Sequence, residues 1–498
     1  MNKLLLHTHE RRGILLAWLG GTLAVAMLVR LVLWLVYSPV PLHDTPSYRR
    51  LADSVLAGFA RYDGTRTPGF PAFLALVGSD GRVWVVQMVL GVLICLLLFY
   101  LGRQISGRSW FGGLLALAHT LNLGQLFFEA NLLTETLTTF YLSAAFAGVY
   151  LLLRQDTRPQ WGLAALTGAA ASLALLTRPL FVYLPVWATL FLLFAAATSV
   201  VKSKQSRLPN VVTTSVVTLK THSWKILLVR LVSFAIPVVL LVGGWVLFIH
   251  QRFGDWALTT MTGYHLIQHT GSYFEYVPDE YAALRDTYIQ FRDAKIAAAG
   301  TQTNAIWEAI PEMSRVSGLN FYDLSRTLAR ISVQLIREHP DLFLKNAAGG
   351  WWMFWRAPVY WSPDALKVPG LEGTVRVLIT AERALLVAVN AFFVIGSLVW
   401  LGVFCVPARL IRRLPAFLQR LRAAFRPEDN PPGVGSINQH FMLFIAGNIW
   451  ITSILQSLLD HGDNPRFLVP LQSFVVLWVA WFILITLQGG LQEIRNHD

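Results

Sequence analysis

The chain has 498 residues, of which 55% are hydrophobic and only 14% are charged, and it contains 18 tryptophans. Soluble domains carry a much larger share of charged side chains, so this composition excludes a soluble enzyme and predicts an integral membrane protein. The formal net charge of +13 would also suit nucleic-acid binding. Basic cytoplasmic loops account for most of that charge, so nucleic acid is not expected as a partner.

Apolar runs long enough to cross a hydrocarbon core of about 30 Å recur along the chain and predict an all-α membrane protein with about ten transmembrane helices. The expected spans lie near residues 14–36, 83–101, 110–127, 134–153, 161–177, 180–200, 226–249, 384–406, 440–458 and 467–487. The first run is longer than the apolar part of a usual signal peptide, and no cleavage site with small residues follows it. It is therefore expected to remain as an anchor.

Lysine and arginine residues lie before the first span and in alternate loops after it. They are Lys3, Arg11, Arg12, Arg103, Arg108, Arg154, Arg158, Lys202, Lys204, Arg207, Lys220, Lys225, Arg409, Arg412, Arg413, Arg420, Arg422 and Arg426. Because such residues collect in cytoplasmic loops, we expect a multi-pass protein of a bacterial inner membrane with its N-terminus in the cytoplasm. The basic loop 407–435 would lie on anionic lipid headgroups.

The opposite, extracytoplasmic side holds most of the polar segments. They are residues 37–82, 128–133, a turn around 177–180, residues 250–383 and residues 459–466. This pattern divides the chain into three parts. Residues 1–249 form an N-terminal membrane module that includes the first outer loop. Residues 250–383 form a helical segment outside the membrane or at its surface, and residues 384–498 form the C-terminal membrane helices.

Residues 250–383 carry two local patterns. Apolar side chains at positions 324, 328, 331 and 335 repeat at helical spacing after the start signal Asn320, so a helix is expected over residues 320–338, and Pro340 begins the next one. The aromatic run from Trp351 to Trp361 is typical of a membrane interface. It would anchor the chain there, or form a wall that holds a sugar or a polyprenyl chain.

Common disulfide, metal and nucleotide motifs are absent from the sequence. Cys95 and Cys405 lie in or at the end of different apolar spans, so neither a disulfide nor a thiolate metal site is expected. There is no P-loop, no dinucleotide-binding pattern after a strand, no His-Glu-x-x-His motif and no serine nucleophile elbow. A nucleotide-driven pump is therefore disfavoured.

Short polar motifs follow one another in the outer segments. They are His43-Asp44-Thr45-Pro46-Ser47-Tyr48, Arg66-Thr67-Pro68-Gly69-Phe70-Pro71, Phe128-Glu129, Thr134-Glu135-Thr136-Leu137, Thr177-Arg178-Pro179, Glu338-His339-Pro340-Asp341 and Asn464-Pro465-Arg466-Phe467-Leu468-Val469-Pro470. In their order and their placement on one side, they resemble the bacterial membrane glycosyltransferases of the GT-C class, which are related to protein mannosyltransferases, aminoarabinose transferases and galacturonosyltransferases. The resemblance covers nearly the whole chain, but residues 272–320 have no recognisable counterpart.

The resemblance implies an enzyme that moves a sugar from a polyprenyl-phosphate carrier to an acceptor outside the cytoplasm, which is a glycan, a lipid or a protein. It implies that Asp44, in the first outer loop, is the base that takes the acceptor's proton. Glu135 matches the acidic residue of the second outer turn, and it would orient the acceptor or hold a divalent cation such as Mg²⁺ or Mn²⁺. Membrane lipids are the other expected partners.

Arginines in the same segments are predicted to bind the carrier's phosphate, because a guanidinium group donates paired, charge-assisted hydrogen bonds. The predicted phosphate-binding residues are Arg66, Arg178 and Arg466, with Lys345 and Tyr48 in addition. Two histidines are candidate metal ligands. His43 precedes Asp44 where many relatives carry a pair of acidic residues, and His461 lies between two aspartates.

Each assignment has an alternative. Asp44 would suit a turn or a helix cap before Pro46, and Glu135 would suit the N-terminus of a helix because of the macrodipole. The arginines would also suit contacts with lipid headgroups. Two other functions stay open: a transporter or flippase of lipid-linked sugars, and a polymerase or ligase that moves a whole glycan.

Overall fold

The structure is a computed structural model that describes residues 12–154, 160–205, 214–405, 434–459 and 465–497, together with Leu418. These residues fold into helices joined by turns. They contain no β-strand, and two isolated β-bridges join Tyr37 to Leu366 and Val40 to Asn131. The all-α class predicted from the sequence is therefore confirmed.

Among the described residues, eight helices are long and apolar enough to cross a membrane. They are α1 (Arg12–Val36), α4 (Asp80–Ser106), α7 (Glu135–Arg154), η1 with α9 (Pro179–Tyr183 and Leu184–Gln205), α10 with η2 and α11 (Thr214–Val238, Val239–Gly243 and Gly244–Phe253), α17 (Leu371–Cys405), α19 (Val434–Leu459), and η8 with α20 (Pro465–Leu468 and Val469–His497). A ninth span would consist of α5 (Ser109–Thr120) and α6 (Leu123–Ala130), which are bent by 54° relative to each other.

The ten predicted spans all fall on helices, but two of them differ from a simple span. The run near residues 110–127 is the bent pair α5–α6, and the run near 161–177 is α8 (Trp161–Thr177), which is apolar but shorter. The bend arises because Asn122 has an extended backbone and starts a new helix, where its side chain accepts a hydrogen bond from the backbone N–H of Gln125 at 2.8 Å. A hydropathy profile does not detect such a break inside a continuous apolar run.

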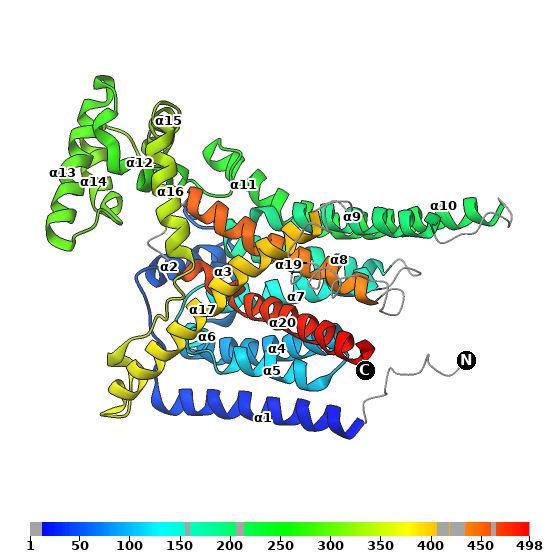
Figure 1. Ribbon diagram of the computed structural model, residues 1–498. Helices are drawn as coiled ribbons and strands as arrows, with labels where there is room; N and C mark the ends of the chain where they lie inside the picture. Colours follow the sequence, from blue (N-terminus) through cyan, green and yellow to red (C-terminus); the bar gives the residue numbers. More distant parts are fainter. Residues whose placement is uncertain are drawn as a thin grey trace.

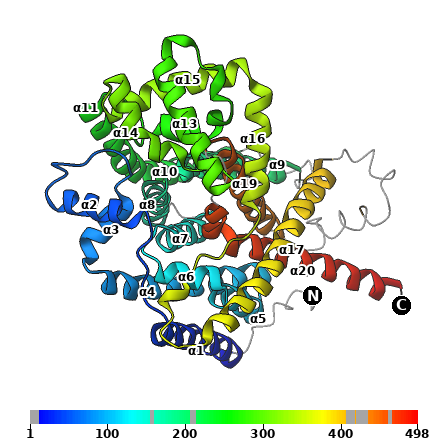
Figure 2. The same cartoon turned by 90° about the vertical axis from the view of Figure 1, so that its left-hand side faces the viewer.

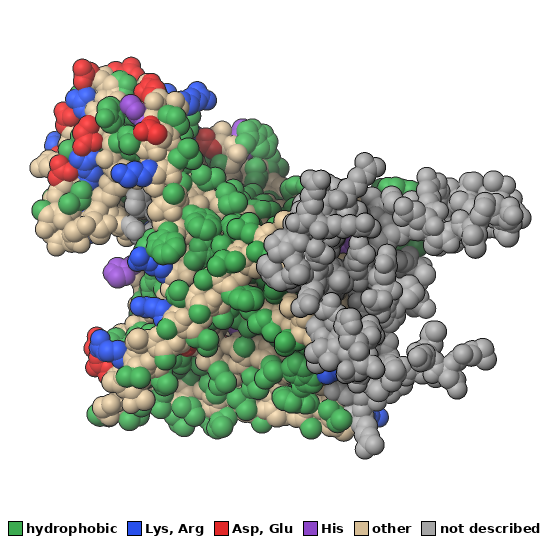
Figure 3. All heavy atoms as spheres, viewed as in Figure 1, with side chains coloured by type: hydrophobic (Ala, Val, Ile, Leu, Met, Phe, Trp, Pro, Cys, Tyr) green, Lys and Arg blue, Asp and Glu red, His purple; other side chains and the backbone are tan. Residues whose placement is uncertain are grey.

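The spanning helices run side by side, and their predicted outer and cytoplasmic ends lie at opposite ends of the helical body (Figure 1). At the predicted cytoplasmic end, Arg154 of α7 hydrogen-bonds to Gln104 of α4. Hydrophobic side chains cover most of the visible described surface of this body (Figure 3). Helix α1 buries only 22% of its apolar span, as expected for a helix that faces lipid. The fold is thus that of an all-helical, multi-pass membrane protein.

A small helical domain with its own apolar core lies at the predicted outer end of the body, and we call residues 254–338 the cap domain (Figures 1 and 2). Its helices are α12 (Thr262–Thr270), η3 (Gly271–Tyr276), η4 (Asp279–Tyr281), α13 (Ala282–Ala299), α14 (Ala305–Ser317) and α15 (Phe321–Glu338). The four apolar side chains at helical spacing in α15 are buried in that core, and Asn320 caps the helix, as predicted. Charged side chains gather on this domain rather than on the body (Figure 3).

Helix α16 (Pro340–Phe354) leads from the cap domain back to the body and begins at Pro340, as predicted. The aromatic run at its end packs largely on spanning helices. Trp351 stacks on Trp450 of α19, and Trp355 lies against Phe393 of α17, whereas Trp352 is exposed. After the short turn η5 (Pro363–Ala365), α17 begins at Leu371, well before the predicted start near residue 384.

Helix α6 is held at both ends by buried polar contacts. At its start, Glu382 of α17 accepts a hydrogen bond from Leu123 N at 2.8 Å. At its end, Arg30 of α1 forms an ion pair with Glu129 at 2.5 Å, and Gln87 of α4 donates to the Glu129 carbonyl at 2.7 Å. Polar groups in an apolar interior are costly unless they are paired, so these contacts fix the segment that leads into α7.

Candidate functional site

Five of the predicted site residues meet at the predicted outer end of the helical body, and we call them the charged cluster. They are Asp44 at the start of α2 (Thr45–Leu56), Arg66 before α3 (Gly69–Val77), Glu135 at the start of α7, Arg178 after α8 and Arg466 in η8. Figure 2 looks onto this end of the molecule, where α2, α3 and α7 lie beside one another. Three guanidinium groups face two carboxylates, which leaves one net positive charge.

Asp44 binds two arginines at once. Its Oδ1 accepts a hydrogen bond from Arg66 Nη2 and its Oδ2 accepts one from Arg466 Nη2, each at 2.8 Å. The residue does occupy the N-cap position of α2, but its side chain makes no capping hydrogen bond. The helix-cap alternative therefore accounts for the position of the Asp44 backbone but not for the contacts of its carboxylate.

The electrostatic surroundings keep Asp44 ionised. Burial raises the pKa of this carboxyl, but the charges and hydrogen bonds of Arg66 and Arg466 outweigh burial and lower the pKa to about 2. The carboxylate therefore stays charged at any physiological pH. In this arrangement it is also a weak base, because protonation would break two charge-assisted hydrogen bonds.

The cluster has an exposed tier and a buried tier. The side chains of Asp44, Arg66 and Arg466 are 24%, 27% and 19% exposed. Below them, Glu135 is 0% and Arg178 is 7% exposed, and Glu135 Oε1 lies 3.3 Å from Arg178 Nη1 and 3.7 Å from Arg466 Nε. Glu135 also opens α7, as the helix-terminus alternative predicts. A ligand entering from outside would thus meet the exposed tier first.

Aromatic rings hold the arginines from the side. The Arg66 guanidinium lies 5.2 Å from the ring centre of Tyr48, and that of Arg178 lies 4.6 Å from the ring centre of Phe467. Burial raises the pKa of Tyr48, which keeps its phenol protonated and available as a hydrogen-bond donor. The rings thus contact the same arginines whose N–H groups face the carboxylates of Asp44 and Glu135.

Tyr360 is a member of this site that the sequence analysis missed. It packs on Phe128 with ring centres 5.6 Å apart, and burial raises the pKa of its phenol, which also feels the charges of Arg466, Glu135 and Arg178. In the sequence it belongs to the aromatic run, which indicated a membrane interface or a wall that holds a sugar or a polyprenyl chain, but nothing singled out Tyr360 itself.

The loop that carries Asp44 is tied by hydrogen bonds to the segment that leads into α7. Val40 N donates to Ala130 O at 3.0 Å, and Leu132 N donates to Val40 O at 3.1 Å. The Thr45 hydroxyl donates to Leu132 O at 3.0 Å. These bonds hold the first outer loop against α7 and so place both carboxylates in one site.

Gly69 lets α3 approach the end of α8. A Cβ atom at this position would lie 2.6 Å from Leu176 O and 2.7 Å from Thr177 N, which are backbone atoms. This close contact brings the Arg66 loop near Arg178.

Replacing Gly69 with alanine is therefore expected to destabilise the fold by about 1–3 kcal/mol, because backbone atoms cannot move aside cheaply. Thermal unfolding followed by tryptophan fluorescence would measure the change. Gly81→Ala is the matched control, since Gly81 lies in α4 and a Cβ there meets nothing within 4 Å. Equal melting temperatures for the two variants would contradict the close-contact explanation.

The remaining predicted site residues lie apart from the cluster or outside the described chain. His43 and Lys345 have exposed side chains, in the first outer loop and on α16. Among the described residues, neither of them forms a hydrogen bond or an ion pair with a residue of the cluster. His461 and most of the basic loop 407–435 lie outside the described residues. In the part that is described, no three His, Cys, Asp or Glu side chains form a group that would hold a metal ion.

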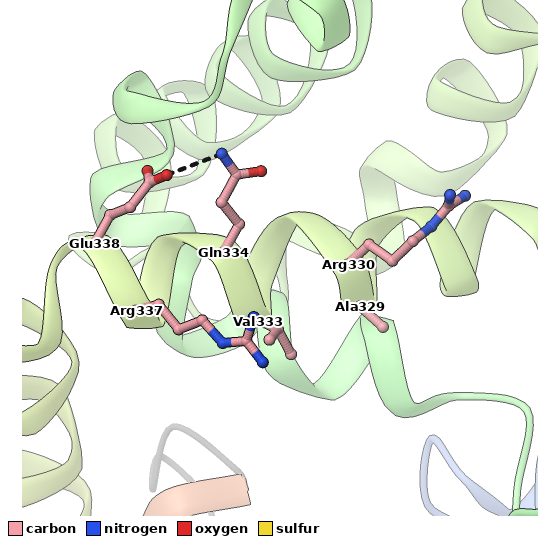
Figure 4. A pocket seen from close by; sticks show the side chains of 6 residues that line it. All are labelled: Ala329, Arg330, Val333, Gln334, Arg337 and Glu338. Atoms are coloured by element: carbon pink, nitrogen blue, oxygen red, sulfur yellow. Dashed lines mark hydrogen bonds between the residues drawn. The ribbon is translucent and has the colours of Figure 1, made fainter.

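A cavity of about 630 Å³ lies along α15 in the cap domain and contains none of the cluster residues. Its lining residues are Ala329, Arg330, Val333, Gln334, Arg337 and Glu338 (Figure 4). In Figure 4, Gln334 and Glu338 are hydrogen-bonded to each other and point away from Arg337 and Val333. Since all of these lining residues belong to a single helix, we place the candidate site at the charged cluster.

The Arg30–Glu129 pair was also missed, although Arg30 is a visible charge inside an apolar run. Cys95, in α4 near this pair, is free and buried, and the side chain of Cys405 is not among those described. Comparison with protein-family models finds no match for this chain, and comparison with curated proteins finds none either.

Proposed function

We propose that this protein is a glycosyltransferase of the outer face of a bacterial inner membrane. It takes a sugar from a polyprenyl-phosphate carrier and transfers it to a hydroxyl group of a glycan, a lipid or a protein. The observation that supports this proposal best is the meeting of Asp44 with Arg66, Arg178 and Arg466 at one end of an apolar helical body.

The proposed reaction is one displacement at the anomeric carbon. The acceptor oxygen forms a bond to that carbon while the bond from the carbon to the phosphate oxygen breaks, and the electron pair leaves with the phosphate. Asp44 takes the proton of the acceptor hydroxyl. The arginines stabilise the negative charge that develops on the phosphate. A single displacement inverts the configuration of the sugar.

Within this proposal, the two carboxylates have different tasks. Asp44 is partly exposed and can meet an acceptor, whereas Glu135 is fully buried between Arg178 and Arg466. Glu135 would hold these arginines in place, and its action on the acceptor or on a cation stays a prediction. Three guanidinium groups already bring positive charge to the phosphate, so the proposed reaction uses neither Mg²⁺ nor Mn²⁺. Binding of such an ion by His43 stays a prediction.

The location of the cluster suits a lipid-borne substrate. It lies at the end of the helical body opposite the last turns of α4 and α7, which carry the predicted cytoplasmic residues Arg103 and Arg154. By the positive-inside rule this is the extracytoplasmic end. No nucleotide sugar is available there, so an activated sugar would arrive on a lipid, and its headgroup would reach the level of the cluster.

The lipid that copurifies with the protein tests the proposal. Mass spectrometry of extracts from detergent-purified wild type is expected to show a polyprenyl phosphate or its glycoside, which Arg466→Ala loses. Arg50→Ala is the control, since Arg50 is exposed in α2 and pairs with Asp63.

Incubation with a labelled lipid-linked sugar separates the alternatives. A transferase yields free polyprenyl phosphate and a product carrying one sugar, a flippase leaves the donor intact, and a ligase moves a longer glycan. Absence of polyprenyl lipids from the wild-type preparation would contradict the proposal.

A further inference from the structure

We infer that the Asp44 carboxylate occupies the carrier's phosphate subsite before the donor binds. The incoming phosphate must displace this carboxylate from Arg66 and Arg466. The displacement frees Asp44 to act as the base. This inference rests on the proposed function and adds an order of events to it. The base becomes competent only when the donor is in place.

The competition follows from which atoms are already paired. Both oxygens of Asp44 accept guanidinium hydrogen bonds, one from Arg66 Nη2 and one from Arg466 Nη2, each at 2.8 Å. A phosphate group offers the same kind of oxygens to the same N–H donors. The carboxylate and the phosphate therefore seek the same partners on the exposed tier.

The buried tier explains how the arginines can change partners and stay in place. Arg466 also faces Glu135, whose carboxylate is 0% exposed at 3.7 Å from Arg466 Nε, and Arg66 lies on the ring of Tyr48. Glu135 is thus a fixed counter-charge for the cluster. Asp44, which is 24% exposed and lies in a loop, is the exchangeable one.

Displacement changes the chemistry of the carboxylate. While both arginines hold Asp44, its pKa stays at about 2 and its oxygens are weak bases toward an acceptor hydroxyl. Loss of these hydrogen bonds and the nearby negative phosphate both raise the pKa of a carboxyl group. After transfer, Asp44 gives its proton to water, and the carboxylate again competes for the arginines, which favours release of the polyprenyl phosphate.

Binding of farnesyl phosphate in detergent tests the competition directly. Asp44→Asn removes the competing charge at nearly constant shape, so it is expected to bind farnesyl phosphate about tenfold more tightly than wild type while it loses transfer. Asp53→Asn is the control, because Asp53 is an exposed carboxylate of the same helix and the change in net charge is the same. It is expected to match wild type in both binding and transfer. Asp44→Ala serves as a second variant, and each variant is first shown to be monodisperse with a near-wild-type melting temperature.

A second measurement needs no variant. In wild type, the pH profile of kcat reports the donor-bound enzyme and that of kcat/KM reports the free enzyme. Displacement raises the pKa of Asp44 in the donor-bound enzyme. As the pH is lowered, kcat is therefore expected to fall at a higher pH than kcat/KM. Asp44 variants that bind farnesyl phosphate no more tightly than Asp53→Asn, or acid limbs that coincide, would overturn the inference. If wild type transfers sugar and the Asp44 variants do not, the base assignment still stands. Failure of wild type itself to bind farnesyl phosphate would instead remove the proposed function.

Discussion

Arg466→Lys is expected to lower sugar transfer by about 100- to 1,000-fold, the cost of losing one well-placed donor to a developing negative charge. Arg466 is the cluster residue that faces both carboxylates, with Nη2 2.8 Å from Asp44 and Nε 3.7 Å from Glu135. Lysine keeps the positive charge but presents a single ammonium group, which cannot reach two oxygen ligands in the planar arrangement of a guanidinium group. Initial rates with a labelled polyprenyl-phosphate sugar would measure the loss.

Arg50→Lys is the matched control for this variant. Arg50 is an exposed arginine of α2 that pairs with Asp63 and lies outside the charged cluster, so the same substitution there is expected to leave transfer unchanged. Both variants should keep the wild-type melting temperature within a few degrees. If Arg466→Lys transfers sugar at the wild-type rate, the paired N–H donors of the Arg466 guanidinium group are not needed.

Glu129→Gln is expected to destabilise the fold by about 3–5 kcal/mol, because it leaves the Arg30 guanidinium charged and without its counter-ion in an apolar interior. The two side chains are 2% and 5% exposed and lie 2.5 Å apart. Little space is left for rearrangement, since a Cβ at Gly91 would lie 2.1 Å from Glu129 Oε1. Thermal unfolding in detergent would report the loss.

Two comparisons show whether this loss comes from the unpaired charge. The double variant Arg30→Gln with Glu129→Gln is expected to recover part of the stability, because two neutral amides can hydrogen-bond without a buried charge. Glu372→Gln breaks an exposed pair with Arg376 on α17 and is expected to cost about 0.3–0.5 kcal/mol. If Glu129→Gln melts at the same temperature as Glu372→Gln, the pair does not secure α6.

The sequence predicts the candidate site better than it predicts the paths of the helices. Charged residues are rare in this chain, so Asp44, Arg178 and Arg466 stand out at the ends of apolar runs. Hydropathy places them on the same side of the membrane, and their contact then depends on how the helices pack. The structure provides that packing through the hydrogen bonds of Val40 and Thr45 with the segment before α7.

Features that depend on local geometry could not be predicted from the sequence. The break between α5 and α6 rests on one extended residue, Asn122, inside a continuous apolar run. The sequence singled out Glu135 rather than Glu129 for the site, and only packing shows that Glu129 is taken by Arg30. Tyr360 was not singled out, because its position near the charges of the cluster depends on how the chain returns from α16 to α17.

The most direct test of the account is sugar transfer by purified Asp44→Asn compared with wild type, under conditions where both bind the carrier. Wild type is expected to convert the lipid-linked sugar into polyprenyl phosphate and a glycosylated acceptor, and the variant is expected to do so at least about 100-fold more slowly, because it lacks the general base. A folded Asp44→Asn protein that transfers sugar at the wild-type rate would contradict it.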